Sequence, residues 1–205
     1  MKALKYILLL AALTISGAAL AQAAKEDAQK PNENAKLTLH KNKNGIDGVL
    51  LEVYIKGEIE DIWKIITDPK MLPELYTSMK KVERLEKQKS DDEKIDINLW
   101  RYTLDSPLGD KVLTVRTRDE HARFRTSWIR TEGDLAHFGG VFILKKSEDH
   151  KGYVRLVYRN YVDGGKWVPQ WITNKLNQKD AANMVGVLKK KLFEMRKSRK
   201  EDKGE

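Results

Sequence analysis

The 205-residue sequence contains no cysteine, so no disulfide can stabilise the fold, and thiol catalysis and cysteine-ligated metals are excluded. Its four histidines, His40, His121, His137 and His150, are scattered and do not have the spacing of metal ligands. The sequence also lacks a Walker loop, a Gly-x-Gly-x-x-Gly motif and a Gly-x-Ser-x-Gly nucleophile motif. We therefore expect no metal, no cofactor and no catalytic residue.

Long hydrophobic runs are missing after residue 23, because no later segment reaches the ~20 apolar residues of a membrane span. Residues 1–23 combine Lys2 and Lys5 with an apolar run at residues 6–15 and Ala-x-Ala sites at residues 19–23, which is the pattern of a signal peptide. No cysteine follows the small residues, which excludes a lipoprotein signal. We expect cleavage and export to a bacterial periplasm, and an uncleaved N-terminal anchor is the alternative.

The formal net charge is +9, yet lysine and arginine alternate with acidic residues along most of the chain, as on a solvated surface. Only residues 189–200 (KKKLFEMRKSRK) are strongly basic. Export argues against nucleic acid as a partner. The basic segment has two interpretations: it solubilises an exposed helix end, or it makes transient contact with an anionic membrane surface.

Residues 24–35 are polar and have no apolar periodicity, so we expect a flexible linker, then a single domain at residues 36–198 and a charged tail at residues 199–205. Within the domain, alternation of apolar and polar residues between turn residues predicts β-strands. The strands are expected at residues 36–41, 46–56, 80–87, 95–103, 111–118, 122–130, 141–146 and 153–162.

Apolar residues at helical spacing predict two short helices at residues 58–67 and 71–76, and a long helix at residues 168–197. The long helix is either continuous or has a break or kink at the poorly patterned residues 174–180. Strands about ten residues apart, joined by short polar turns, indicate an antiparallel meander. The sequence thus predicts an α+β domain in which a curved antiparallel sheet wraps around the long C-terminal helix. Because a single helix cannot fill so concave a sheet, we expect a cavity between them.

Four segments carry a family resemblance, two of them being PLGDKVLTVRTR and Gly140-Val141-Phe142. DIWKIITDPKMLPELYTSMKKVERLE, from Asp61 to Glu86, resembles the helix–helix–strand opening of START (StAR-related lipid transfer) domains, which belong to the SRPBCC helix-grip superfamily. YVDGGKWVPQWITN, from Tyr161 to Asn174, is similar to the segment that opens their C-terminal helix. The resemblance extends over about residues 50–192. It implies a helix-grip fold with a hydrophobic cavity that holds one lipid, sterol or similar molecule.

The resemblance and the apolar pattern together suggest a set of ligand-binding residues, for several of which ordinary core packing is the alternative. The set is Trp100, Arg116, Phe124, Trp128, Leu156, Tyr158, Trp171, Met184, Val185 and Leu188. Arg116 is expected in the cavity, with the solvent face of its strand as the alternative. Trp171 is expected to point toward the cavity or its seal, so that Trp171→Ala destabilises the fold. Trp167 is expected to act as a gate or to touch a membrane.

We expect a non-enzymatic carrier or sensor that binds a lipid or other hydrophobic small molecule in the periplasm. One alternative is a cyclase- or hydrolase-like enzyme on the same fold, since a fold does not determine function. Another is an interaction protein with a filled core. Access to a closed cavity would require movement of the final helix or of adjacent loops.

Overall fold

The computed structural model describes residues 35–166 and 168–202, which belong to one compact unit. The predicted signal peptide and residues 24–34 of the predicted linker lie outside the described residues. Trp167, the predicted gate, also lies outside them.

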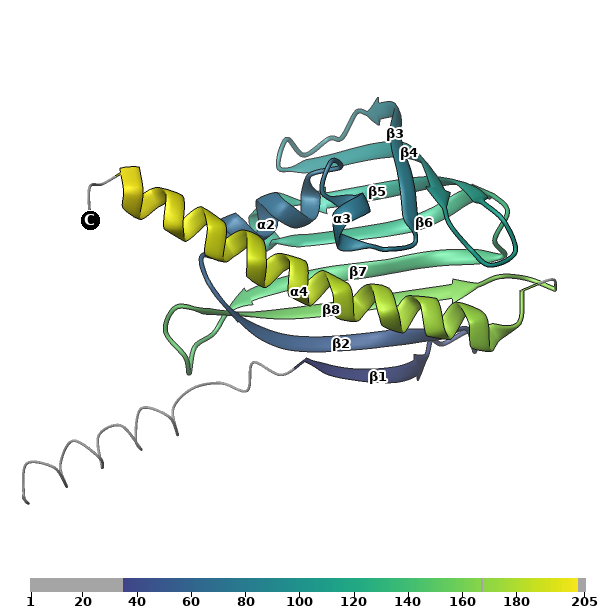
Figure 1. Ribbon diagram of the computed structural model, residues 1–205. Helices are drawn as coiled ribbons and strands as arrows, with labels where there is room; N and C mark the ends of the chain where they lie inside the picture. Colours follow the sequence, from purple (N-terminus) through teal and green to yellow (C-terminus); the bar gives the residue numbers. More distant parts are fainter. Residues whose placement is uncertain (1–34, 167, 203–205) are drawn as a thin grey trace, which may run out of the picture. The chain divides into compact units, whose positions relative to one another are not determined.

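The described residues form an eight-stranded antiparallel sheet with the order β1-β2-β8-β7-β6-β5-β4-β3 (Figure 1). Its strands are β1 (Lys36–Lys41), β2 (Asp47–Lys56), β3 (Met79–Gln88), β4 (Ile95–Leu104), β5 (Lys111–Glu120), β6 (Arg125–Gly133), β7 (His137–Lys146) and β8 (Tyr153–Asp163). Strands β3 to β8 follow one another as a meander, and β2 returns to pair with β8. The predicted antiparallel meander is confirmed, with strand ends that differ by a few residues from those expected.

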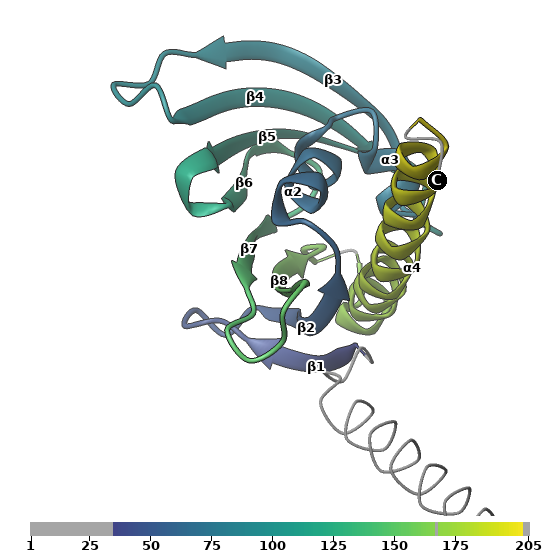
Figure 2. The ribbon, with the colours of Figure 1, turned by 90° about the vertical axis from the view of Figure 1, so that its left-hand side faces the viewer.

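Strand β8 shows how the sequence gives the sheet one buried face. Val154, Leu156, Tyr158 and Asn160 alternate along the strand and are all buried, whereas Arg159 between them is exposed. Side chains two residues apart in a strand point to the same face, so one apolar set covers one side of the sheet. Figure 2 shows that the sheet is curved and that all the labelled helices lie on its concave side.

The helices are α2 (Ile59–Thr67), α3 (Leu72–Leu75) and α4 (Gln170–Asp202). The predicted helix-grip arrangement is confirmed, because α4 runs across the concave side, where it contacts β2 and β8 as well as α2 and α3 (Figure 1). Its 33 residues span about 50 Å at about 1.5 Å per residue. Within the described ranges, no helix combines the length and the apolar content needed to cross a bilayer.

Of the alternatives for residues 174–180, the continuous helix is confirmed and the break is wrong, since α4 is one unbroken helix. Thr173, Asn177 and Asp180 are buried on this stretch. Their three- to four-residue spacing places them on one side of the helix. The apolar pattern is therefore interrupted because the inward-facing side chains here are polar, and not because the helix ends.

The helix also extends beyond the expected domain boundary at residue 198. Arg199 donates two hydrogen bonds to the carboxylate of Asp61 in α2, from Nη1 to Oδ2 at 2.8 Å and from Nη2 to Oδ1 at 2.6 Å. Such two-pronged arginine–carboxylate pairs combine charge with fixed geometry. Residues 199–202 therefore belong to α4, although they were expected in a charged tail.

Strand β6 begins at Arg125, three residues later than expected, because a 3₁₀ turn at His121–Arg123 comes first. Phe124 ends this turn in the left-handed region, with φ at 46°. Its ring lies edge-on to Trp63, with 5.9 Å between ring centroids. Phe124 therefore lies outside β6, although residues 122–130 were expected to form one strand.

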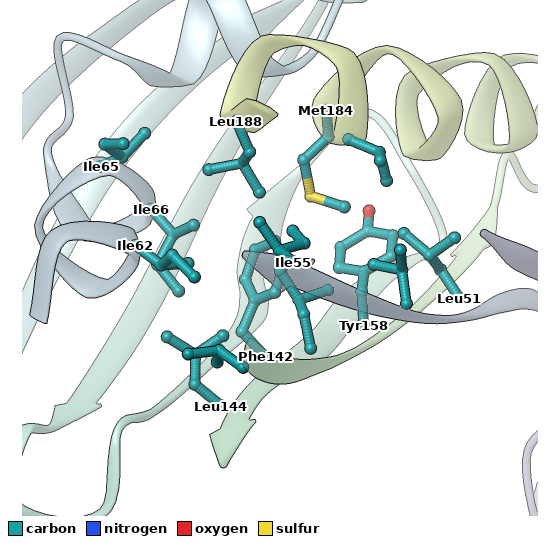
Figure 3. Close-up of a cluster of buried hydrophobic side chains, with 14 of the residues drawn as sticks. Leu51, Ile55, Ile62, Ile65, Ile66, Phe142, Leu144, Tyr158, Met184 and Leu188 are labelled. Carbon is teal, nitrogen blue, oxygen red and sulfur yellow. The ribbon is translucent and has the colours of Figure 1, made fainter. Parts of the chain in front are cut away.

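The core joins the inner face of α4 to the concave face of the sheet. Figure 3 shows Met184 and Leu188 of α4 pointing toward Tyr158 and the neighbouring strands, with side chains of α2 beside them. Met184 and Leu188 are 0% exposed. A second apolar cluster fills the concave face of β3, β4 and β5 and includes Met79, Trp100, Tyr102, Leu104, Leu113, Val115, Leu135 and Phe138.

Candidate ligand-binding cavity

A cavity with a volume of ≈ 70 Å³ lies between the concave face of the sheet and the segment from α2 to the start of β3. Its wall is mostly apolar and rich in aromatic rings: Tyr76, Trp100, Tyr102, Trp128, Phe138, Phe142 and Tyr158. We call this space the first lobe. A second lobe of ≈ 70 Å³ adjoins it and shares Ser78, Leu104, Phe138, Asn160 and Asp180 with it. The second lobe lies against the first half of α4.

The aromatic wall is held by ring contacts from three adjacent strands. Trp128 of β6 stacks on Tyr158 of β8 with 5.8 Å between centroids, and Phe142 of β7 lies 4.8 Å from Tyr158. Gly140 makes room for Trp128, because a Cβ at this position would come within 2.4 Å of the indole ring. The rings thus form a continuous surface that a flat apolar molecule can contact.

Both tryptophans of the wall have their indole N–H groups satisfied within the protein. Trp100 Nε1 donates to Thr117 Oγ1 at 3.0 Å, and Trp128 Nε1 donates to Asn160 Oδ1 at 3.1 Å. Buried indoles without such partners would lose hydrogen-bond energy. The bonds fix both ring planes and leave their apolar faces for the cavity.

Polar side chains of α4 connect the helix to the cavity wall. Asn160 Nδ2 donates to Asn177 Oδ1 at 3.0 Å, and Asn177 Nδ2 donates to the backbone oxygen of Asn160 at 3.0 Å. Asp180 accepts hydrogen bonds from Thr77 Oγ1 at 2.8 Å, from the backbone N–H of Ser78 at 3.1 Å, and from the Ser78 hydroxyl. These groups set the position of α4 over the cavity.

Asp119 of β5 is an acidic group in the wall of the first lobe. Burial raises the pKa of the Asp119 carboxyl, and the hydrogen bond from the Thr126 hydroxyl and the charge of His121 act in the opposite direction, while Asp96 adds to the increase. Burial also raises the pKa of the Tyr76, Tyr102 and Tyr158 phenols, so these hydroxyls stay neutral. Asp119 is therefore a hydrogen-bonding group in a largely apolar wall.

The structure divides the sequence-predicted site residues into three groups: residues that line the cavity, residues in the core, and residues exposed to solvent. Trp100, Trp128 and Tyr158 line the first lobe, where the sequence placed them. Leu156, Met184, Val185 and Leu188 are buried in the core beside the cavity and do not line it. Phe124 packs against the same core from its turn. That any of them binds a ligand remains a prediction.

Arg116 and Trp171 do not lie where they were expected. Arg116 is exposed, because Leu113, Val115 and Thr117 are the inward residues of β5. An alternation of two therefore puts Arg116 on the convex, solvated face. Trp171 is 67% exposed on the outer side of the first turn of α4. Neither side chain reaches the cavity.

Sequence reasoning missed Asp119 and Asp180 as parts of the site. Asp119 continues the inward alternation of Leu113, Val115 and Thr117, and this alternation was the available signal. Asp180 lies in the stretch of α4 where the apolar pattern fails, so a buried polar side chain was the available explanation. In the described part of the chain, no group of His, Cys, Asp and Glu side chains is arranged to hold a metal ion.

An open groove of ≈ 500 Å³ lies on the other side of part of the cavity wall. Pro69 and Trp100 line both the groove and the first lobe. On the groove side, the Arg84 guanidinium lies 4.8 Å from the centre of the Trp100 ring. Trp100 therefore separates the interior from solvent.

The curved sheet, the long helix and the internal cavity together define a helix-grip protein. No protein-family model and no curated protein sequence matches the chain. Its fold is similar to that of human StAR-related lipid transfer protein 5, with a TM-score of 0.59 and 10% identity over 89% of this chain and 97% of that one. A StAR-related lipid transfer protein from Xanthomonas axonopodis also has a similar fold, with a TM-score of 0.58 and 14% identity over 80% of this chain and 96% of that one.

An aromatase/cyclase from Streptomyces has a similar fold as well, with a TM-score of 0.51 and 14% identity over 76% of this chain and 94% of that one. Sequence identities this low establish only that the folds are similar. The chain has the START-type helix-grip fold that the sequence resemblance implied.

Proposed function

We propose that the protein binds a lipid or another hydrophobic small molecule in the two-lobed cavity, as a carrier or sensor in the periplasm. The observation that carries the proposal is the internal, mostly apolar cavity, whose tryptophans already have their N–H groups bonded. An apolar ligand gains about 25 cal/mol for each Å² of surface removed from water. The similarity to two lipid transfer proteins supports the same function. The periplasmic location rests on the predicted signal peptide.

Native mass spectrometry of the purified protein, followed by lipid extraction, tests this function. A co-purifying hydrophobic molecule at one per protein is expected. Protein that stays empty after incubation with an extract of bacterial membrane lipids would contradict the proposal and favour an interaction protein with a filled core.

The cavity must widen to admit a lipid-sized ligand. Each lobe has a volume of ≈ 70 Å³, whereas ligand pockets typically have about 300–1,000 Å³. The wall formed by Pro69 and Trp100 is a candidate for the moving part, because both residues line the first lobe and the outer groove.

Trp100→Leu is therefore expected to speed the release of a bound apolar fluorophore such as N-phenylnaphthylamine severalfold, since the smaller side chain leaves an opening to the groove. Stopped-flow displacement measures the release rate. Tyr102→Leu is the matched control, because Tyr102 lines the first lobe but not the groove. An equal acceleration in both variants would argue against an opening at Trp100.

A second candidate function is a cyclase- or hydrolase-like enzyme, favoured by one observation. Asp119 places a carboxyl group with a raised pKa in an apolar wall, a setting in which carboxyl groups can act as general acids. The extracted ligand, incubated with fresh protein and followed by mass spectrometry, separates the two functions. An unchanged ligand supports a carrier, and conversion supports an enzyme.

We also propose transient contact with anionic membranes through the outer face of α4. This face carries Lys175, Lys179 and Lys190 together with the exposed rings of Trp171 and Phe193, all on the side opposite the core. Lysines with exposed aromatic residues suit an anionic lipid surface, where the rings enter the headgroup region. The basic segment contributes less, because Lys191 and Arg199 pair with Glu74 and Asp61.

Trp171→Ala is expected to change the free energy of unfolding by less than about 0.5 kcal/mol, because the side chain is mostly in water. This corrects the destabilisation predicted from the sequence. The same variant should bind phosphatidylglycerol vesicles severalfold more weakly in a co-sedimentation assay. Leu108→Ala, which removes an exposed leucine from the β4–β5 turn, is the control and should leave vesicle binding unchanged.

A further inference from the structure

The polar groups of the first lobe are negatively charged or neutral. They comprise the carboxylates of Asp119 and Asp180, the amide of Asn160, and the hydroxyl groups of Thr67, Tyr76, Ser78, Tyr102, Thr117, Thr126 and Tyr158. Among the described residues that line this lobe, none is lysine, arginine or histidine. The only predicted basic residue of the site, Arg116, lies on the convex face. A ligand in the first lobe therefore meets negative charge together with neutral hydroxyl and amide groups.

The two carboxylates differ in how far their oxygens are already used. Asp180 accepts three hydrogen bonds, from Thr77 and Ser78, and so serves to hold α4. Asp119 accepts one from the Thr126 hydroxyl, which leaves lone pairs for another donor. Asp119 is thus the carboxylate that a ligand can use.

A second buried acceptor lies on β4, beside a residue of the lobe wall. Asn98 is 5% exposed, and within the described residues its Oδ1 has no hydrogen-bond partner. Asn98 is the cross-strand partner of Thr117, which lines the first lobe two residues before Asp119. Asn98 does not itself line the first lobe, so Asp119 is the acceptor there that favours a ligand with a donor.

We propose that the first lobe selects a hydrophobic molecule that carries a hydrogen-bond donor, an amine or a hydroxyl, which pairs with Asp119, and that it rejects hydrophobic acids. This inference names the ligand class for the proposed function and rests on it. An ammonium group at this position gains a charge-assisted hydrogen bond, and the neighbouring indoles of Trp100 and Trp128 attract a cation through their ring faces. A carboxylate or phosphate gains neither.

The environment of Asp119 strengthens this preference. Burial already raises the pKa of the carboxyl group, and Asp96 adds to the effect, so a further anion would bring like charges together at a half-buried site. A cation would relieve the same unfavourable interaction. Selection therefore depends on the sign of the ligand's charge and on its donors, in addition to its apolar surface.

Four compounds with one ring system test the proposal: methylnaphthalene, naphthalenemethanol, naphthalenemethylamine and naphthoate. Quenching of tryptophan fluorescence, with Trp100 and Trp128 as reporters, gives their dissociation constants at neutral pH. The amine and the alcohol should bind more tightly than methylnaphthalene, the amine by at least about tenfold, and naphthoate should bind more weakly. Asp119→Asn, which keeps an acceptor oxygen, should remove most of the amine's advantage and leave that of the alcohol.

Asp110→Asn is the matched control, because it removes an exposed carboxylate of the same charge from the β4–β5 turn and should not alter the order of affinities. Tightest binding by naphthoate, equal binding by all four compounds, or an unchanged amine preference in Asp119→Asn would overturn the inference while leaving the proposed function intact. Failure of every compound, including methylnaphthalene, would overturn the inference too, and the co-purifying lipid would then decide the proposed function separately. Melting temperatures of both variants confirm that they are folded.

Discussion

Leu188→Ala is expected to lower the free energy of unfolding by about 3 kcal/mol, because truncating a fully buried leucine leaves a cavity that the surrounding core fills only in part. Leu188 is 0% exposed and lies on the inner face of α4, beside Met184 and against the core between the helix and the sheet (Figure 3). Urea denaturation followed by circular dichroism measures the loss.

Phe193→Ala provides the control on the same helix. Phe193 is larger than Leu188 but is 64% exposed, so its removal should change stability by no more than about 0.5 kcal/mol. If the two variants lost equal stability, the orientation of α4 described above would be contradicted. The comparison therefore tests which side of the helix grips the sheet.

Asp180→Ala is expected to cost about 3 kcal/mol, because it removes one acceptor from three donors in a buried site. The Thr77 hydroxyl, the Ser78 hydroxyl and the Ser78 backbone N–H all donate to this carboxylate. Their loss disconnects α4 from the start of β3, so the cavity should also become more accessible to solvent. Thermal unfolding gives the stability, and hydrogen exchange at the start of β3 reports the local loosening.

The Asp180→Asn variant separates the contribution of these hydrogen bonds to stability from the contribution of the negative charge. Asparagine keeps Oδ1 for Thr77 and the Ser78 N–H, and its Nδ2 can donate to the Ser78 hydroxyl in place of Oδ2. The Asn variant should therefore lose less than half of the stability that the Ala variant loses. Near-equal losses would show that the negative charge, and not the hydrogen-bond geometry, holds the helix.

Much of the fold could be predicted from periodicity. The residues of β8 alternate so regularly that both its bounds and its buried face follow from the sequence. The stripe from Ala181 to Leu192 similarly predicts the inner face of α4, because residues three and four apart share one side of a helix. Trp100, Trp128 and Tyr158 were found in the same way, as large apolar residues on inward-facing positions.

For β5, periodicity is a weaker guide to which face of the strand is buried. Leu113 and Val115 face inward, but Val112 on the other face is apolar as well, so the pattern favours the correct face only weakly. The family resemblance implied an arginine in the cavity, and the solvent face of the strand was the alternative. The face that β5 turns toward the cavity carries Asp119, and Arg116 lies on the opposite face in solvent. The charged group at the site is therefore negative, where a positive one was expected.

By itself, the sequence determined the order and type of the elements, the curved sheet with its long covering helix, and the aromatic character of the enclosed space. Tertiary structure alone decided that Trp171 faces outward, that Asp180 is a buried acceptor, and that Asp119 is the carboxylate in the cavity wall. The physical reason is that periodicity relates side chains within one element, whereas the face that becomes buried depends on contacts with elements distant in the chain. Polar residues at such contacts break the apolar pattern, and their partners become visible only in the folded protein.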